Sequence, residues 1–190
     1  MDEFKDRLNK IIPRITSDDL LQNKGLGNEI GFYIFDYPPE KELEMRTYIQ
    51  FILTYVKKKR PELTIRHINL FELIIAYLER RKLLGKALKM QQKGKNLDLL
   101  KALKAPLSAD KISHVFVEEA DLENCDLVLV SGVGSLWPLM RSHNLLNNLH
   151  PLMGDTPLVM FYPGRFTGQG LRLFDKLNEI NYYRAFQLVP

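Results

Sequence analysis

The chain has 190 residues, of which 45% are hydrophobic and 26% charged, with one cysteine and a net charge of +4. This length predicts a single domain over residues 1–190, and the composition is that of an ordinary globular protein. The lone Cys125 excludes an internal disulfide, and we interpret it as a buried, inert thiol. No leader-like run opens the sequence, and the apolar runs are too short to cross a bilayer. These features predict a cytoplasmic protein.

The first part of the chain predicts helices and then an alternation of strands and helices. Residues 2–24 have the apolar spacing of short helices. The apolar run at 30–37, stopped by two prolines, predicts a strand, and 40–59 predicts a helix. A second strand and helix are expected at 63–70 and 71–84.

A basic segment, residues 85–106, interrupts this alternation, and its leucine spacing predicts a helical excursion. From Lys86 to Lys111, seven lysines stand against two acids, a local net charge of +5. Such lysines can contact nucleic-acid phosphates, or they can form the solvated side of amphipathic helices. The segment lacks interleaved aromatic residues, and both interpretations remain open here.

The most informative stretch is residues 127–138. The apolar run at 127–130 predicts a buried strand, Gly132 and Gly134 a tight bend, and Ser135 the N-cap of a helix over 136–149. Pro138 fits the first turn of such a helix. A glycine turn at a helix N-terminus can bind phosphate, but neither the nucleotide-triphosphate nor the dinucleotide glycine motif is complete. We interpret the turn as architectural, with a phosphate site as the alternative.

The remaining elements complete an α/β pattern. We expect a strand at 157–162, a glycine-rich loop at 163–170, a helix near 171–177 and a last strand at 184–189. Strands that alternate with helices predict a three-layer α/β domain with a mostly parallel sheet of about five strands, Rossmann-like or resembling a degenerate P-loop fold.

In a parallel sheet the loops after the strands gather at one edge, where ligands bind. The candidate binding residues at this edge are Asp36, Asn69, Ser131, Gly132, Gly134, Ser135, Gly164, Arg165, Gly168 and Gln169. Asp36 is the best single acid for chemistry, but it can equally form a turn or cap the next helix. A nucleotide- or nucleic-acid-binding module at this edge is therefore one candidate function.

Catalytic and metal motifs are incomplete. Neither Ser131 nor Ser135 has the glycine spacing of a hydrolase nucleophile, and His143 lies too far along the same predicted helix to act as a base. His143 and His150 are two helical turns apart, so one ion cannot bridge them. We expect no catalytic residue, no metal and no cofactor, and hence no enzyme.

Trp137 and Arg141 form a further candidate site. On one predicted helix they would lie one turn apart, and Trp and Arg are favoured anchors in protein interfaces. The alternative places Trp137 in the core, beneath the second glycine-rich loop.

Several unusual runs together resemble the BrxB family, the small component of the bacterial BREX (bacteriophage exclusion) systems. The runs are G-L-G-N-E (25–29), F-Y-I-F-D-Y-x-P-E (32–40), S-G-V-G-S-L-W-P (131–138), R-S-H-x-L-L-N-N-L (141–149), G-D-T-P-L-V-M-F-Y-P-G (154–164) and N-Y-Y-R-A-F (181–186). The resemblance covers nearly the whole chain and is weakest at 86–106.

The resemblance implies a role in phage resistance beside an ATPase, a DNA methyltransferase and PglZ, an alkaline-phosphatase-like protein. It implies no catalytic residue in this chain. We therefore expect a non-enzymatic adaptor with PglZ as its direct partner and no membrane contact. Nucleic acid at Lys86–Lys111 remains an open partner.

Overall fold

The computed structural model describes residues 3–22, 31–168, 170–178 and 185–190. The strands are β1 (Phe32–Tyr37), β2 (Ile65–Asn69), β3 (Leu127–Ser131), β4 (Leu158–Phe166), β5 (Leu171–Leu173), β6 (Leu177–Asn178) and β7 (Phe186–Gln187). The helices are α1 (Glu3–Ile15), α2 (Asp18–Leu21), α3 (Glu42–Lys59), α4 (Leu70–Arg80), α5 (Leu84–Gln92), α6 (Asn96–Lys104), α7 (Ala109–Ala120), α8 (Val133–Leu136) and α9 (Ser142–Leu149). Short 3-10 turns occupy Pro39–Lys41 and Leu122–Asn124.

One open sheet organises these elements, in the order β2-β3-β4-β1-β7. All four neighbouring pairs along this path are parallel. β5 and β6 add an antiparallel extension to the end of β4. The predicted α/β fold with a mostly parallel sheet is confirmed.

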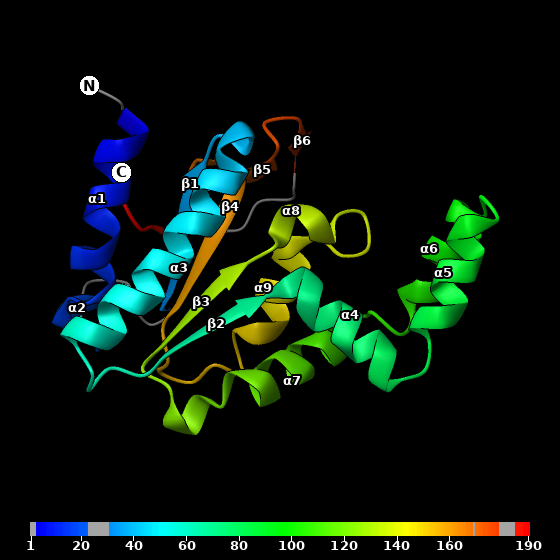
Figure 1. The fold of residues 1–190 in the computed structure, drawn as a ribbon, viewed down its shortest axis with the longest axis horizontal. Coiled ribbons are helices and arrows are strands. Elements are labelled where there is room, and N and C mark those ends of the chain that lie inside the picture. Colours follow the sequence, from blue (N-terminus) through cyan, green and yellow to red (C-terminus); the bar gives the residue numbers. More distant parts are fainter. Residues whose placement is uncertain (1–2, 23–30, 169, 179–184) are drawn as a thin grey trace.

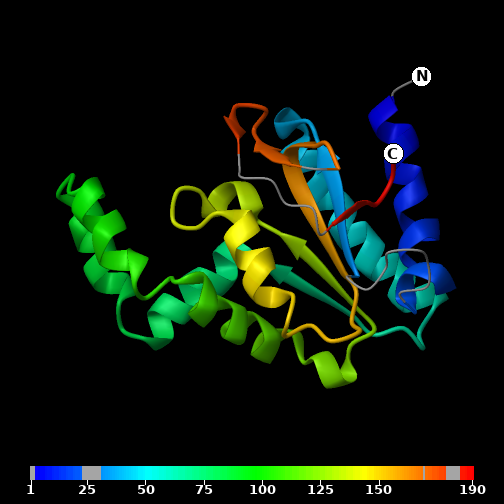
Figure 2. The same ribbon diagram turned by 180° about the vertical axis from the view of Figure 1, so that it is seen from behind.

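Apolar clusters cover both faces of the sheet, as parallel sheets require. Successive residues of β3 face opposite clusters: Val128 and Val130 face α4, α7 and α9, whereas Leu127 and Leu129 face α1 and α3. Figure 1 shows α3 crossing in front of the sheet, and Figure 2 shows α9 on the opposite face. This two-sided burial explains why β3 is apolar throughout.

The basic segment is helical, as predicted, and its two helices α5 and α6 form an antiparallel hairpin. Figures 1 and 2 show this hairpin projecting from the body beyond α4. Ala87 and Leu103 join the core cluster on the α4 face of the sheet, whereas Leu88 and Leu97 are exposed. The hairpin is therefore anchored to the body through one side only.

The predicted helix over 136–149 is wrong. Trp137 ends the short α8 in an extended conformation, the Trp137–Pro138 peptide is cis, and α9 begins only at Ser142. A proline disfavours the helical backbone conformation in the residue that precedes it, which explains why the helix breaks at Trp137. Pro138 is thus in a loop rather than a first helical turn. Ser135 lies inside α8, whose N-cap is Gly132.

The expected helix near 171–177 is also wrong, because β5 and β6 occupy this region. Leu171 and Leu173 are buried on either side of the exposed Arg172, which is the period-two pattern of a strand. β4 continues to Phe166 and provides the ladder on which β5 pairs. The predicted loop at 163–170 shrinks accordingly to a turn after Phe166.

Candidate functional site

Asn69 and Ser131 end the neighbouring strands β2 and β3 and lie opposite each other in the register. The Asn69 side-chain oxygen accepts hydrogen bonds from the amides of Phe71 (3.1 Å) and Glu72 (3.4 Å). Its amide nitrogen donates to the Glu72 carboxylate at 3.0 Å. Asn69 is thus the N-cap of α4, a stabilising role that occupies its side chain.

Ser131 is bonded to a histidine that the sequence did not single out. The His67 Nε2 lies 2.8 Å from the Ser131 Oγ, which ties β2 to β3 across 64 residues of sequence. Burial lowers the pKa of His67, while Glu72 acts weakly in the opposite direction. Among the described residues no carboxylate is hydrogen-bonded to this imidazole, so the pair lacks the orienting acid of a hydrolase triad.

The glycine turn after β3 is packed closely against neighbouring elements. Gly132 has a φ of +76°, and a Cβ there would lie 2.1 Å from the Asn69 Oδ1. A Cβ at Gly134 would lie 2.9 Å from the Phe174 ring. Gly132 thus has a positive φ and both glycines are closely packed, which agrees with the tight bend expected from the sequence. Protein atoms fill the space beside both glycines, which favours the architectural interpretation.

Asp36 is the last but one residue of β1, lies beside Tyr162 of β4 and is buried. Its carboxylate accepts from Arg7 Nη2 at 2.6 Å and from the Phe166 amide at 3.0 Å, and the Gln187 amide lies 3.5 Å away. Arg7 also donates to the Asp36 carbonyl at 3.0 Å. This acid therefore joins α1, β1, β4 and β7, a role that the open turn-or-cap alternatives did not include.

The remaining candidates at this edge lie on the β4–β5 hairpin or beside α8. Gly164 faces Leu173 in the antiparallel ladder, and the exposed Arg165 has its Nε 3.7 Å from the Asp175 carboxylate. Gly168 is exposed in the turn of the β4–β5 hairpin. Ser135 is exposed on α8, and Gln169 lies outside the described residues. The structure thus brings Asn69, Ser131 and Gly132 together, but not the whole predicted set.

Trp137 and Arg141 both lie in the connection between α8 and α9, which we call the Trp137 loop (residues 137–141). Trp137 is 39% exposed, so it is not a core residue, and Arg141 is exposed as well. Because the predicted continuous helix is absent, the two residues do not share a helix face. Both are exposed residues of one loop, four positions apart in sequence.

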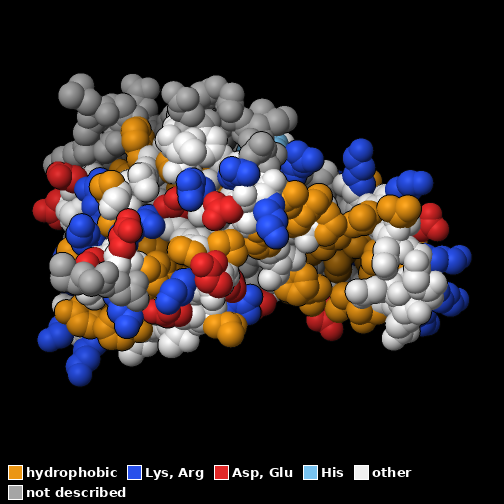
Figure 3. Space-filling model, turned by 90° about the horizontal axis from the view of Figure 1, so that it is seen from above, with side chains coloured by type: hydrophobic (Ala, Val, Ile, Leu, Met, Phe, Trp, Pro, Cys, Tyr) orange, Lys and Arg blue, Asp and Glu red, His pale blue; other side chains and the backbone are white. Residues whose placement is uncertain are grey.

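A cleft of about 320 Å³ separates the Trp137 loop from the helical hairpin. We call it the hairpin cleft, and it is lined by Leu100, Lys101, Lys104, Pro138 and Leu139. Figure 3 shows hydrophobic side chains gathered between the body and the projecting hairpin, with basic side chains around them. An exposed apolar patch rimmed by charges is typical of a protein-binding surface.

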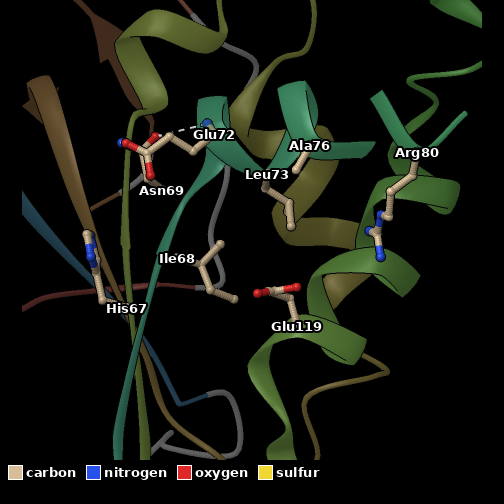
Figure 4. A pocket seen from close by; sticks show the side chains of 8 residues that line it. All are labelled: His67, Ile68, Asn69, Glu72, Leu73, Ala76, Arg80 and Glu119. Atoms are coloured by element: carbon tan, nitrogen blue, oxygen red, sulfur yellow. Dashed lines mark hydrogen bonds between the residues drawn. The ribbon is translucent and has the colours of Figure 1, made fainter. Parts of the chain in front are cut away.

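A second cleft, of about 350 Å³, lies beside the edge strand β2 between α4 and α7. Figure 4 shows Ile68 of β2 and Leu73 of α4 pointing into it, with Glu119 extending from α7 toward Ile68 and Arg80 at the far end of α4. Asn69 is the one predicted site residue among those that line it. The charged residues that line this cleft have both signs, and their side chains do not converge on a common point.

The described parts of the chain contain no group of three or more His, Cys, Asp or Glu side chains arranged to hold a metal ion. Among the same residues, no helix combines the length and apolarity needed to span a bilayer.

Comparison with known proteins identifies the family. The family model "BREX protein BrxB" matches residues 66–188. The chain belongs to the BrxB family. It is 40% identical over 184 residues to a BREX protein BrxB of Escherichia coli O9:H4 (strain HS), covering 97% of this chain and 90% of that relative. It is also 40% identical over 194 residues to one from Bacillus cereus (strain H3081.97), covering 100% and 99% respectively. No solved structure matches the chain significantly.

The part that matches the BrxB family model extends from β2 to just beyond β7. It includes the glycine turn, the Trp137 loop and the helical hairpin. This BrxB chain is accordingly a component of a BREX system, which works with other BREX proteins.

Proposed function

We propose that this BrxB protein is a non-enzymatic adaptor in a BREX phage-defence complex and that PglZ is its direct partner. The observation that carries the proposal is the Trp137 loop. It presents a 39% exposed tryptophan and an exposed arginine next to an apolar cleft. Aromatic and arginine side chains supply much of the binding free energy in protein interfaces.

The state of the polar groups at the sheet edge supports the same proposal. The side chains of Asp36, Asn69 and Ser131 are each hydrogen-bonded to other groups of the protein. The space beside Gly132 and Gly134 is filled by Asn69 and Phe174. Groups so engaged stabilise the edge and would have to exchange partners before they could bind a substrate or a phosphate.

Co-purification with PglZ from cells that carry the complete defence operon tests the proposal. Arg141→Ala should leave the melting temperature nearly unchanged, because Arg141 is exposed and forms no ion pair with a described residue. The variant should retain less PglZ and protect cells less well from phage. If the unmodified protein retains no PglZ, the proposed partner is wrong.

A further inference from the structure

The helix α6 exposes one stripe that continues the surface of the Trp137 loop. Leu97, Leu100, Lys101 and Lys104 lie at positions i, i+3, i+4 and i+7, which is one face of a helix. The last three of these line the hairpin cleft together with Pro138 and Leu139. The buried Leu103 lies off this stripe and anchors the helix to the core.

Both leucines of this stripe leave apolar surface accessible to solvent. Leu97 is 75% exposed at the outer end of α6, and Leu100 is only partly buried. At the inner end of the stripe stands Pro138, whose neighbour Trp137 is 39% exposed. Neither Leu97 nor Trp137 lines the cleft itself, but Leu97 lies one helical turn before Leu100 on α6 and Trp137 directly precedes Pro138. Exposed apolar side chains on both sides of the cleft lining indicate a surface that a partner can cover.

The charge of this surface has one sign. Two of the five residues that line the hairpin cleft are lysines, and none is acidic. Arg141 lies two residues after Leu139 in the same loop. Neither Lys101, Lys104 nor Arg141 forms an ion pair with any residue that the structure describes.

We propose that the α6 stripe, the hairpin cleft and the Trp137 loop together bind an acidic amphipathic segment of the partner protein. Its apolar side chains would cover Leu97, Leu100 and Trp137, and its carboxylates would pair with Lys101, Lys104 and Arg141. This inference rests on the proposed adaptor function and specifies which surface carries it and what chemistry the partner presents. Opposite charge at the rim favours the correct partner and its rate of association.

The apolar track distinguishes this occupant from nucleic acid. Lysines alone would suit phosphates, but aliphatic side chains such as Leu97 and Leu139 gain nothing from a phosphate backbone. Single-stranded nucleic acid is bound by stacking on several aromatic rings, whereas Trp137 is the one aromatic residue among those of the α6 stripe, cleft and loop. A helix that lays its apolar side into a groove matches the surface better.

The apolar part of the proposal is tested with two matched leucine substitutions in the full-length chain. Leu97→Asp should weaken the binding of purified PglZ, measured by biolayer interferometry, by about tenfold or more. Leu43→Asp is the control, because Leu43 is 76% exposed on α3, far from this surface in sequence and fold. Both variants should melt like the unmodified protein, since neither removes a core side chain.

The charged part is tested with paired reversals. Lys101→Glu with Lys104→Glu should weaken PglZ binding by about tenfold and make it less sensitive to salt. Lys57→Glu with Lys58→Glu at the end of α3 makes the same change in net charge at another exposed site and should have little effect.

The outcomes are distinct. Loss of binding in both surface variants, with retention in both controls, supports the inference. If the unmodified chain binds PglZ and the surface variants bind it equally well, the inference is overturned while the proposed function stands. If the unmodified chain does not bind PglZ, the proposed function fails and this inference with it. Binding of a short DNA duplex that is lost on lysine reversal but kept in Leu97→Asp would make this a nucleic-acid surface and also overturn the inference.

Discussion

Arg7 and Asp36 form an ion pair, 29 residues apart in sequence, that joins the N-terminal helix α1 to the end of strand β1. The Nη2···Oδ1 distance is 2.6 Å, and the side chains are only 16% and 11% exposed. Arg7 also donates to the carbonyl of Val189 at 3.0 Å, so the pair fixes both ends of the described chain to the carboxyl edge of the sheet.

Asp36→Asn should therefore destabilise the protein without affecting partner binding. The change leaves the mostly buried Arg7 without its counter-charge, which costs about 2–4 kcal/mol of unfolding free energy. Urea denaturation measures the loss. Asp121→Asn is a suitable control, because its pair with Arg66 is exposed and contributes about 1 kcal/mol at most. Intact stability of the Asp36 variant together with lost PglZ binding would instead assign Asp36 to a binding site.

Gly134→Val should lower the free energy of unfolding by about 1–3 kcal/mol. A side chain at residue 134 meets the Phe174 ring at 2.9 Å and Pro163 at 3.1 Å, so the β4–β5 hairpin would have to shift. Gly85→Ala serves as control, since no atom lies within 4 Å of a Cβ at that position. A thermal melt of the Gly134 variant identical to that of the parent would show that the turn tolerates side chains.

His67 should make the stability of the protein fall in mild acid. Burial lowers its pKa below the ordinary value of 6.5, so the unfolded chain binds a proton more readily than the folded one. The contribution is fully present above pH 6.5 and is lost as the pH falls towards the lowered pKa. The measurement is the free energy of unfolding between pH 7.5 and about 5. His67→Gln should flatten this dependence relative to the parent, and a variant with the same pH dependence as the parent would contradict the assignment to His67.

Cys125 should react slowly with iodoacetamide in the folded protein at neutral pH. Cys125 is half-buried rather than fully buried as expected, and this burial raises the pKa of its thiol, while its Sγ donates to the Leu127 carbonyl at 3.2 Å, so little reactive thiolate is present. Alkylation followed by mass spectrometry should show slow modification under native conditions and rapid modification in urea. Equal rates in both conditions would contradict this placement of Cys125.

Much of the fold was predictable because its signals are local. The apolar run at 127–130 forms β3, the leucine-rich basic segment forms the hairpin, and the glycines at 132 and 134 form a close-packed turn. Each of these follows from a periodicity or a conformational preference within about ten residues. The α/β alternation and the mostly parallel sheet followed from the order of such segments.

The misplaced elements had local signals that a stronger effect overrode. Leucine spacing after Ser135 favours a helix, but the restriction that Pro138 imposes on Trp137 ends it. The stretch 171–177 is so short that its apolar spacing fits a helix as well as a strand. Pairing with the extended β4 makes it a strand. The site changed accordingly, because Trp137 and Arg141 moved from a helix to a loop.

The tertiary contacts at the sheet edge could not be predicted from patterns among neighbouring residues in the sequence. The bonds of Asp36 to Arg7 and of Ser131 to His67 join residues 29 and 64 positions apart. Each residue has an ordinary local role, so no spacing in the sequence reveals the pair. The hairpin cleft likewise appears only when α6 and the Trp137 loop are brought together by the fold.

We propose that this protein acts by binding another protein rather than by chemistry on a nucleotide. Isothermal titration of the purified chain, first with PglZ and then with ATP and GTP in the presence of magnesium, distinguishes the two. We expect saturable heat with PglZ, reduced in Arg141→Ala, and no saturable heat or turnover with either nucleotide. Saturable nucleotide binding or magnesium-dependent hydrolysis, abolished by a substitution at Ser135, together with no heat from PglZ, would show instead that this protein acts on nucleotides and does not bind PglZ.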